Sequence, residues 1–259
     1  MSTDSLQQIL MFPFRGNGWQ GRFAVACLLM LGNYVIPIIP VIFLAGYLVE
    51  IMRRVILDGR SPELPDWSDF GGFGLRGIKA LGAAFILNLP SAIFIMAGLV
   101  LSFMPSLMVP FIDRFSRDAT GLIVFLMLAM MATMFVMFGI GMLFSLLIGA
   151  FMPVSLNHLA AKDSFLAAFN IGEWWKVMRA NLSGYFLAWL VVMGLYMVAM
   201  FAMQILYFTV ILCCLLPIVM SVIYTYMGMV AAALFASAYR EGQSRLTFHL
   251  PADVDAPAA

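Results

Sequence analysis

Charge is the scarcest property of this sequence. Asp, Glu, Lys and Arg together make up 10% of the 259 residues, whereas 64% of the residues are hydrophobic. An ordinary soluble domain has about 25% charged and about 45–50% apolar residues. Both departures indicate a chain whose main solvent is the lipid bilayer. The net charge of +1 provides no basic field for nucleic acid, so we expect no nucleic acid partner.

Residues for metal, redox or catalytic chemistry are also few. The chain has three cysteines and two histidines, with no Cys-x-x-Cys or Cys/His ligand spacing, so we expect no metal site and no cofactor. The Gly-x-Gly-x-x-Gly spacing occurs at 16–21 and 72–77, but an apolar segment follows each match and no strand precedes it. We therefore expect no catalytic residue and no enzyme activity.

Long apolar segments dominate the chain instead. They predict an all-α, polytopic integral membrane protein with six transmembrane helices in three hairpins, at residues 23–36, 40–52, 76–104, 121–151, 182–212 and 218–239. In the first region, 23–52, one kinked helix and a two-helix hairpin are both open, because two prolines interrupt the apolar run. One helix would be about 45 Å long against a hydrocarbon core of about 30 Å, which favours the hairpin.

The remaining segments are polar. Residues 1–21 are amphipathic and too short to span, so we expect an interfacial cytoplasmic segment. Residues 22–240 form a single helical membrane domain in this interpretation, and 241–259 form a disordered cytoplasmic tail.

The basic residues orient the chain. Twelve of the fourteen fall in the N-terminal segment, in 53–79, in 158–180 and in the tail, which six spans place on one side. The positive-inside rule makes that side cytoplasmic. We therefore expect the cytoplasmic (inner) membrane, with both termini in the cytoplasm and amphipathic connections between the hairpins there. A five-span topology would divide the basic residues ten to four and fits less well.

The stretch 53–70 is the longest charged run between apolar regions. Glu50 precedes Arg53 and Arg54 by three and four residues, which predicts ion pairs at the membrane surface. The alternative is a coupling or substrate-binding carboxylate. We expect Trp67, with Phe70 and Phe73, to dip into the lipid headgroup region.

Polar groups deep in the apolar segments are rare. Asn33, Asn88 and Gln204 are the main ones, and we expect them to form hydrogen bonds between helices or to line a path for a small neutral solute. Small residues recur every four positions in two segments, which predicts closely packed helix faces that can face each other. These faces comprise Gly141, Ser145 and Gly149 in the fourth span and Gly228, Ala232 and Ala236 in the sixth.

Several of these residues also carry a family resemblance. Gly-Tyr-Leu at 46–48, Arg53-Arg54-Val55, Gly59, Leu64-Pro65-Asp66-Trp67-x-Asp69, Gly77-x-Lys79 and Leu89-Pro90 follow in order, and 167–173 add a second match. This series resembles a prokaryotic multi-pass membrane family, the domain of unknown function 4013, over roughly residues 12–240. The resemblance implies a helical integral membrane protein and says nothing about activity.

Three functions are compatible with the sequence. The leading one is a non-enzymatic scaffold or accessory subunit that packs against other membrane proteins or further copies of the chain, because deep charges are missing and small-residue faces are present. The second is a channel or permease for a small neutral or amphipathic solute. The third is a membrane enzyme that acts on lipid through Asp66, Asp69 or His158.

Overall fold

The computed structural model describes residues 3–59, 62–112, 120–207 and 215–248. Helices account for most of the described residues, and there is no strand among them, so the expected all-α fold is confirmed. The chain divides into two compact units, one of residues 1–83 with 153–259 and one of residues 84–152.

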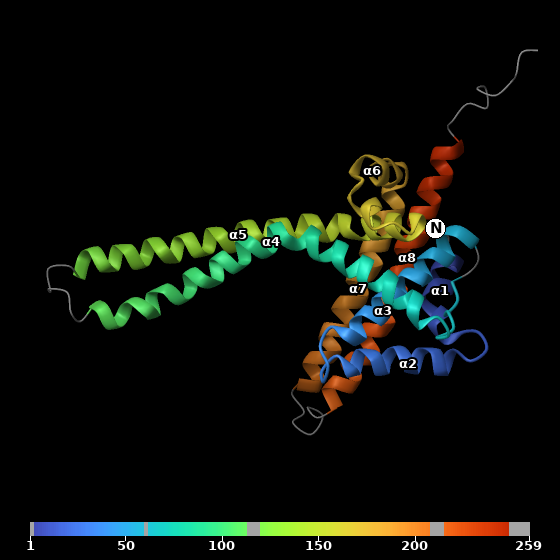
Figure 1. Cartoon of the computed structure of the whole chain (residues 1–259), viewed down its shortest axis with the longest axis horizontal. Coiled ribbons are helices and arrows are strands. Elements are labelled where there is room, and N and C mark those ends of the chain that lie inside the picture. The colour runs from blue at the N-terminus through green and yellow to red at the C-terminus, as the bar shows by residue number, and fades with distance from the viewer. Residues whose placement is uncertain (1–2, 60–61, 113–119, 208–214, 249–259) are drawn as a thin grey trace, which may run out of the picture. The chain divides into compact units, whose positions relative to one another are not determined.

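Eleven helical elements are present in the described ranges (Figure 1). They are α1 (Thr3–Met11), η1 (Phe12–Phe14), α2 (Trp19–Gly32), α3 (Ile39–Arg53), η2 (Arg54–Asp58), α4 (Phe70–Ile112), α5 (Thr120–Lys162), η4 (Phe165–Phe169), α6 (Ile171–Ala180), α7 (Leu182–Tyr207) and α8 (Leu216–Phe248). Of the short elements, η1 and η4 are 3₁₀-helices, and η2 is a turn of π-helix.

Four helices in the described part of the chain are long and apolar enough to cross a membrane. They cover Phe70–Met104, Val124–Lys162, Leu182–Leu206 and Leu216–Thr247. Residues 23–52 form two helices, α2 of 14 residues and α3 of 15, rather than one kinked helix. Pro37 and Pro40 stand on either side of Ile39, the first residue of α3. Neither has a backbone N–H to donate, so one continuous helix is interrupted here.

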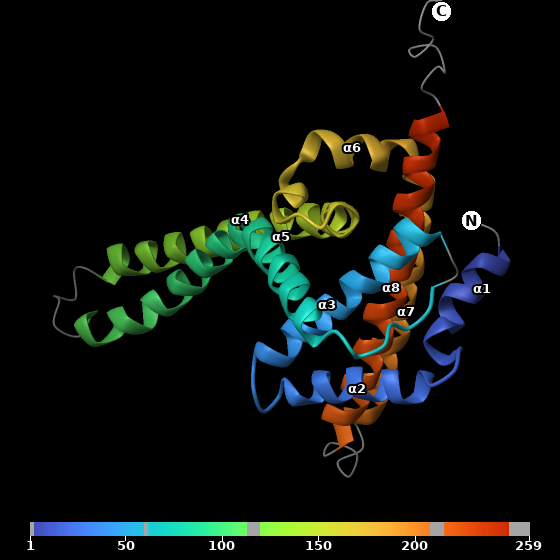
Figure 2. The ribbon, with the colours of Figure 1, turned by 45° about the vertical axis from the view of Figure 1, so that its right-hand side comes forward.

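Helix α8 is the centre of the first unit. Helices α2, α3, α6 and α7 pack against it (Figure 2). Met229, Val230 and Leu234 are fully buried there, and so are Ala232, at 2% exposed, and Ala236. Small side chains allow helix backbones to approach closely, and lipid offers no competing solvent effect, so such a face stabilises a helix bundle.

A second buried cluster joins α3 to the start of α4 and the end of α5. It consists of Val49, Ala80, Ala83, Leu159, Ala160 and Ala168. Two glycines set the crossing of α3 and α4: a Cβ on Gly46 would collide with the carbonyl of Phe73, and one on Gly77 with the carbonyl of Ile42. The chain can make this close crossing only where side chains are absent.

The second unit is an antiparallel pair made by the later part of α4 and the earlier part of α5. The Ser91 hydroxyl donates to the Gly141 carbonyl at 3.0 Å, and the rings of Phe94 and Phe144 stack with centroids 5.6 Å apart. A Cβ on Gly98 would contact Phe138 at 3.3 Å. Hydrogen bonding and ring packing thus hold the two helices along their shared face.

Several expected boundaries are wrong. Helix α4 continues to Ile112, whereas we expected a connection from Pro105, and 113–119 of that connection lie outside the described residues. Helix α5 runs through Pro153 to Lys162. Residues 241–248 extend α8 instead of forming a disordered tail, and 249–259 lie outside the described residues. The predicted helix ends were placed at prolines, and they are wrong because a long apolar helix tolerates proline in lipid.

Candidate functional site

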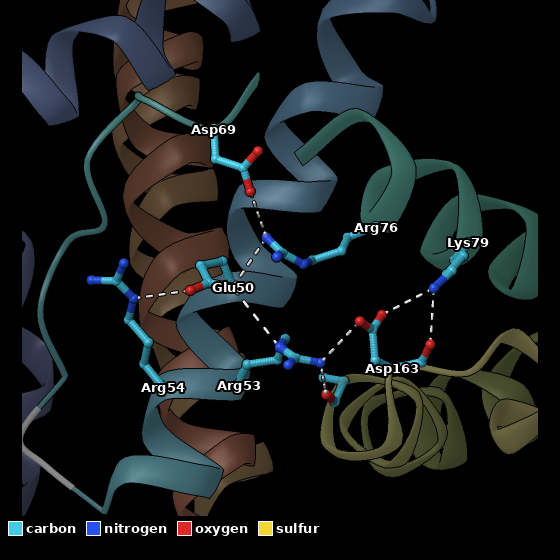
Figure 3. Close-up of polar contacts among 8 residues, drawn as sticks. Glu50, Arg53, Arg54, Asp69, Arg76, Lys79 and Asp163 are labelled. Carbon is cyan, nitrogen blue, oxygen red and sulfur yellow. Dashed lines mark hydrogen bonds and ion pairs between the residues drawn. The ribbon is translucent and has the colours of Figure 1, made fainter. Parts of the chain in front are cut away.

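Four of the charged residues that the sequence singles out, Glu50, Arg53, Arg54 and Asp69, meet in one cluster of the first unit (Figure 3). Glu50 lies at its centre, with a side chain 17% exposed. Arg54 donates from Nε to one carboxylate oxygen at 3.1 Å, and Arg76 Nη1 lies 3.2 Å from the other. Arg53 Nε is 3.9 Å from that second oxygen. One carboxylate therefore lies within ion-pair distance of guanidinium groups from α3, η2 and α4.

Asp163, directly after α5, forms the second half of the cluster. Lys79 Nζ donates both to the Asp163 carboxylate at 3.0 Å and to its main-chain carbonyl at 2.9 Å, and Arg53 lies 3.4 Å away. Burial alone would raise the pKa of Asp163, but the hydrogen bond and charge of Lys79, together with Arg53 and Arg76, outweigh it. The pKa of Asp163 is therefore below its ordinary value.

Arg53 connects the two halves. Besides Glu50 and Asp163, its guanidinium donates to the Ala160 carbonyl at 3.3 Å, near the end of α5. Asp69 lies 3.6 Å from Arg76 and accepts the Gly72 amide at the start of α4. The cluster thus fastens α3, α4 and α5 together, with each acid in it facing at least one base. Paired charges of this kind hold the geometry of the contact between these helices.

Beside the charged cluster lies an aromatic cluster, formed by Tyr47, Trp67 and Phe73. The rings of Tyr47 and Trp67 stack with centroids 4.1 Å apart and planes 4° from parallel, and Phe73 packs edge-on against both. The Tyr47 hydroxyl donates to the Pro65 carbonyl at 2.9 Å. Phe73 is 2% exposed, so the expectation that it dips into lipid headgroups is wrong; the missing side chain at Gly46 lets it pack inward.

Arg22 completes the attachment of the loop before α4. It donates to the Leu64 carbonyl at 2.9 Å and forms an ion pair with Asp66 at 2.6 Å. The Trp67 indole donates back to the Arg22 carbonyl at 2.8 Å. Asp66 is therefore a partner of α2, and Asp69 a partner of Arg76. Among the described residues, no group of three or more His, Cys, Asp or Glu side chains is arranged to hold a metal.

A polar pocket of about 540 Å³ lies near the ends of α5 and α8, beside α6. Its inner wall holds His158, 3% exposed, whose Nδ1 is 2.6 Å from the Tyr239 hydroxyl and whose Nε2 is 3.2 Å from a Glu173 oxygen. Lys162 pairs with Glu173, and this hydrogen bond lowers the pKa of Glu173. The sequence showed no partner for His158, because Tyr239 is 81 positions away.

The deep polar residues serve local structure. The Asn88 amide donates to the Ala84 carbonyl at 2.8 Å and approaches the Met152 sulfur at 3.6 Å, all within the second unit. Asn33 accepts the Ile38 amide at 3.2 Å. Gln204 is exposed on α7. These contacts bring none of the three together.

The small-residue faces differ from each other. Gly141 is buried, and a Cβ there would press on Ile95; a Cβ added at Gly228 would lie 3.4 Å from Leu48 of α3. Each glycine therefore faces a large side chain of a neighbouring helix, Ile95 of α4 or Leu48 of α3, and these contacts do not join the two small-residue faces. Ser145 is exposed, and open space surrounds a Cβ added at Gly149, so the expected burial is wrong for this part of α5.

Apolar helices long enough to span, together with a self-paired charged cluster, define this chain as a helical membrane protein. Its residues 29–208 match the model of the family described as "Protein of unknown function (DUF4013)". The chain belongs to that family, as the series from Gly46 to Pro90 led us to expect. No curated protein and no solved structure matches it.

Proposed function

We propose that this protein is a non-enzymatic membrane scaffold or accessory subunit that packs against other membrane proteins. The observation that supports this role is the pairing of charge in the Glu50 cluster. Glu50 faces three arginines, and Asp163 faces Lys79 and Arg53, so these ionisable groups hold helices in place. A catalytic or ion-coupling site would need an acid or base open to a reacting group.

The later part of the α5 small-residue face is where we propose that a partner helix packs. Ser145 is exposed and Gly149 is open, while the large side chains of Met142, Leu143 and Leu146 are 66%, 58% and 64% exposed. Small residues flanked by large apolar ones suit close helix association in lipid. The occupant is either a different membrane protein or a second copy of this chain.

Purification in mild detergent followed by native mass spectrometry tests the proposal. We expect a stoichiometric partner or a homo-oligomer with the unaltered chain, and its loss with Gly149→Leu. Val136→Ala, also exposed on α5 but more than three turns before Gly149 and outside the proposed contact surface, is the matched control and should keep the complex. A strictly monomeric chain after in-membrane crosslinking, with both variants behaving alike, would contradict the scaffold role.

We also propose the cytoplasmic (inner) membrane as the location, with both termini and residues 53–79 and 158–180 on the cytoplasmic side. The distribution of basic residues supports this orientation. The six-span topology expected from the sequence and a topology with fewer full crossings share this orientation, because both return residue 53 to the side of residue 22.

A permease for a small neutral or amphipathic solute is the second candidate. The observation in its favour is the 540 Å³ pocket, whose lining combines His158 and Gln243 with apolar Val177 and Leu246. Proteoliposome swelling with glycerol and urea as probes tests it. Swelling faster than in empty liposomes, and slowed by Gln243→Leu, would favour the permease over the scaffold.

A further inference from the structure

The turn between α2 and α3, residues 33–38, is apolar and exposed. Val35 is 83% exposed, Ile38 68% and Tyr34 56%, and Ile39, at the start of α3, is 57% exposed. The turn contains no charged residue, and its polar side-chain groups are the Asn33 amide and the Tyr34 hydroxyl. A turn that faces water is expected to carry polar and turn-forming residues, and scattered rather than contiguous apolar ones.

The backbone amides of this turn are satisfied within the hairpin. Asn33 N–H donates to Leu29, Tyr34 to Leu31, and Val35 and Ile36 both to Gly32. Ile39 N–H donates to the Pro37 carbonyl, while Pro37 and Pro40 have no N–H.

Ile38 is the remaining amide, and the Asn33 side chain accepts it at 3.2 Å. Ile38 adopts φ +79°, a conformation that a β-branched residue rarely takes. Asn33 therefore stabilises a strained turn by removing its last free donor. Irregular backbone in hydrocarbon needs hydrogen-bond partners inside the protein, because lipid offers none, and the N–H groups of this turn meet that requirement.

The two arms of this hairpin are too short to carry it across a bilayer. Between Arg22 and the turn, α2 contributes Phe23–Gly32, about 15 Å of helix. Between the turn and Arg53, α3 contributes Ile39–Met52, about 21 Å. The hydrocarbon core is about 30 Å thick. If the turn reached the far surface, the Arg22–Asp66 ion pair would lie near the middle of the core.

We propose that α2 and α3 form a re-entrant hairpin, which enters the bilayer from the side of Arg22 and Arg53 and ends among lipid acyl chains. An apolar groove lies along the hairpin's first arm, formed by Leu28 and Leu31 of α2 and by Ile218 and Val222 of α8. The protein then has four full crossings, α4, α5, α7 and α8, and keeps the orientation given above. This topology requires insertion in a bilayer and is independent of the scaffold role.

Single-cysteine labelling tests the re-entrant hairpin. In a background with Cys27, Cys213 and Cys214 replaced by serine, Val35→Cys is the reporter and Glu63→Cys is the control on the arginine side. A membrane-impermeant maleimide is applied to each face of sealed vesicles. We expect Glu63→Cys to react from one face and Val35→Cys to react about tenfold less than this control from either face. Labelling after SDS denaturation confirms that both thiols are intact.

Each alternative has its own outcome. Reaction of Val35→Cys from the face opposite Glu63→Cys would establish a full crossing, and reaction from the same face would place the turn in water; either overturns the proposal. Ile36→Cys, 54% exposed, provides a second reporter if Val35→Cys fails to fold. A nitroxide at either site should be more accessible to oxygen than to a nickel chelate, and the reverse order would also contradict lipid immersion.

Discussion

Glu50 is the acid on which the charged cluster depends. Glu50→Gln removes the charge shared by Arg53, Arg54 and Arg76 and leaves these guanidinium groups without a common acid. We expect the free energy of unfolding to fall by about 2 kcal/mol, because losing one partner of a half-buried pair leaves uncompensated charge. SDS titration in mixed micelles measures it.

The control for Glu50 is an acid without a role in the cluster. Glu63 is exposed in the loop before α4, and Glu63→Gln should change the free energy of unfolding by less than about 0.5 kcal/mol. Equal effects of the two substitutions would mean that the net charge of the chain, rather than the pairing around Glu50, stabilises the unit.

Asp163 predicts a pH dependence. Its pKa is lower in the folded chain than its ordinary value of 3.8, so its ionised form stabilises folding. That contribution is fully present above the ordinary pKa and is lost as the pH falls through the lowered native pKa. Asp163→Asn should therefore reduce the loss of stability on acidification below about pH 4, measured by SDS titration at several pH values.

Asn is the suitable replacement at this position. Asp163 has φ +49°, and asparagine tolerates that left-handed conformation, so the substitution tests charge without straining the backbone. An unchanged acid response in Asp163→Asn would show that another carboxyl controls it.

The crossing of α3 and α4 makes Gly46 the most sensitive backbone position of the family series. A Cβ there would collide with the Phe73 carbonyl, so Gly46→Ala must separate the two helices. We expect a loss of about 2 kcal/mol in the free energy of unfolding, together with a change in Trp67 fluorescence as its stack on Tyr47 is disturbed.

Gly71 offers a matched control in the first turn of α4, with open space around an added Cβ. Gly71→Ala should be neutral or stabilise by about 0.5 kcal/mol, because alanine favours the helix. If both alanines destabilise equally, the close crossing at Gly46 does not explain the effect.

Buried and open positions of the small-residue faces predict different responses to one enlarged side chain. Gly141→Leu and Ala232→Leu should each lower detergent stability, because a Cβ at Gly141 already presses on Ile95 and Ala232 is 2% exposed. Gly149→Leu should leave it unchanged, since space is open there. Thermal unfolding in detergent measures all three, and unchanged stability in the first two would refute the packing.

At the scale of elements, the sequence predicted long helices better than their ends. Hydrophobic length alone locates α4, α5, α7 and α8. Proline placed the predicted boundaries at 105 and 153, yet α4 and α5 continue past both. The i,i+4 pair of Glu50 and Arg54 was readable from spacing, whereas Arg76 and Asp163 were not, because helix crossing rather than local sequence brings them to Glu50 and Arg53.

At the scale of the molecule, the arrangement of positive charge predicts the orientation. Twelve of the fourteen basic residues fall in segments that we place in the cytoplasm, and Arg114 and Arg117 lie in the expected outer connection, within residues 113–119, outside the described ranges. A green fluorescent protein fused after Phe248 should fluoresce, because it folds in the cytoplasm. Alkaline phosphatase fused at the same point should be inactive.

The complementary fusion tests the opposite side. Alkaline phosphatase inserted after Ser116 should be active, since two crossings by α4 and α5 around it require that connection to face outward when Arg76 and Lys162 face inward. Both fusions active as phosphatase would mean that α7 and α8 together do not return the chain to the cytoplasm. Phosphatase activity only after Phe248 would mean that the whole protein has the opposite orientation. The positive-inside bias acts on all four inner segments together, so it cannot reverse one hairpin alone.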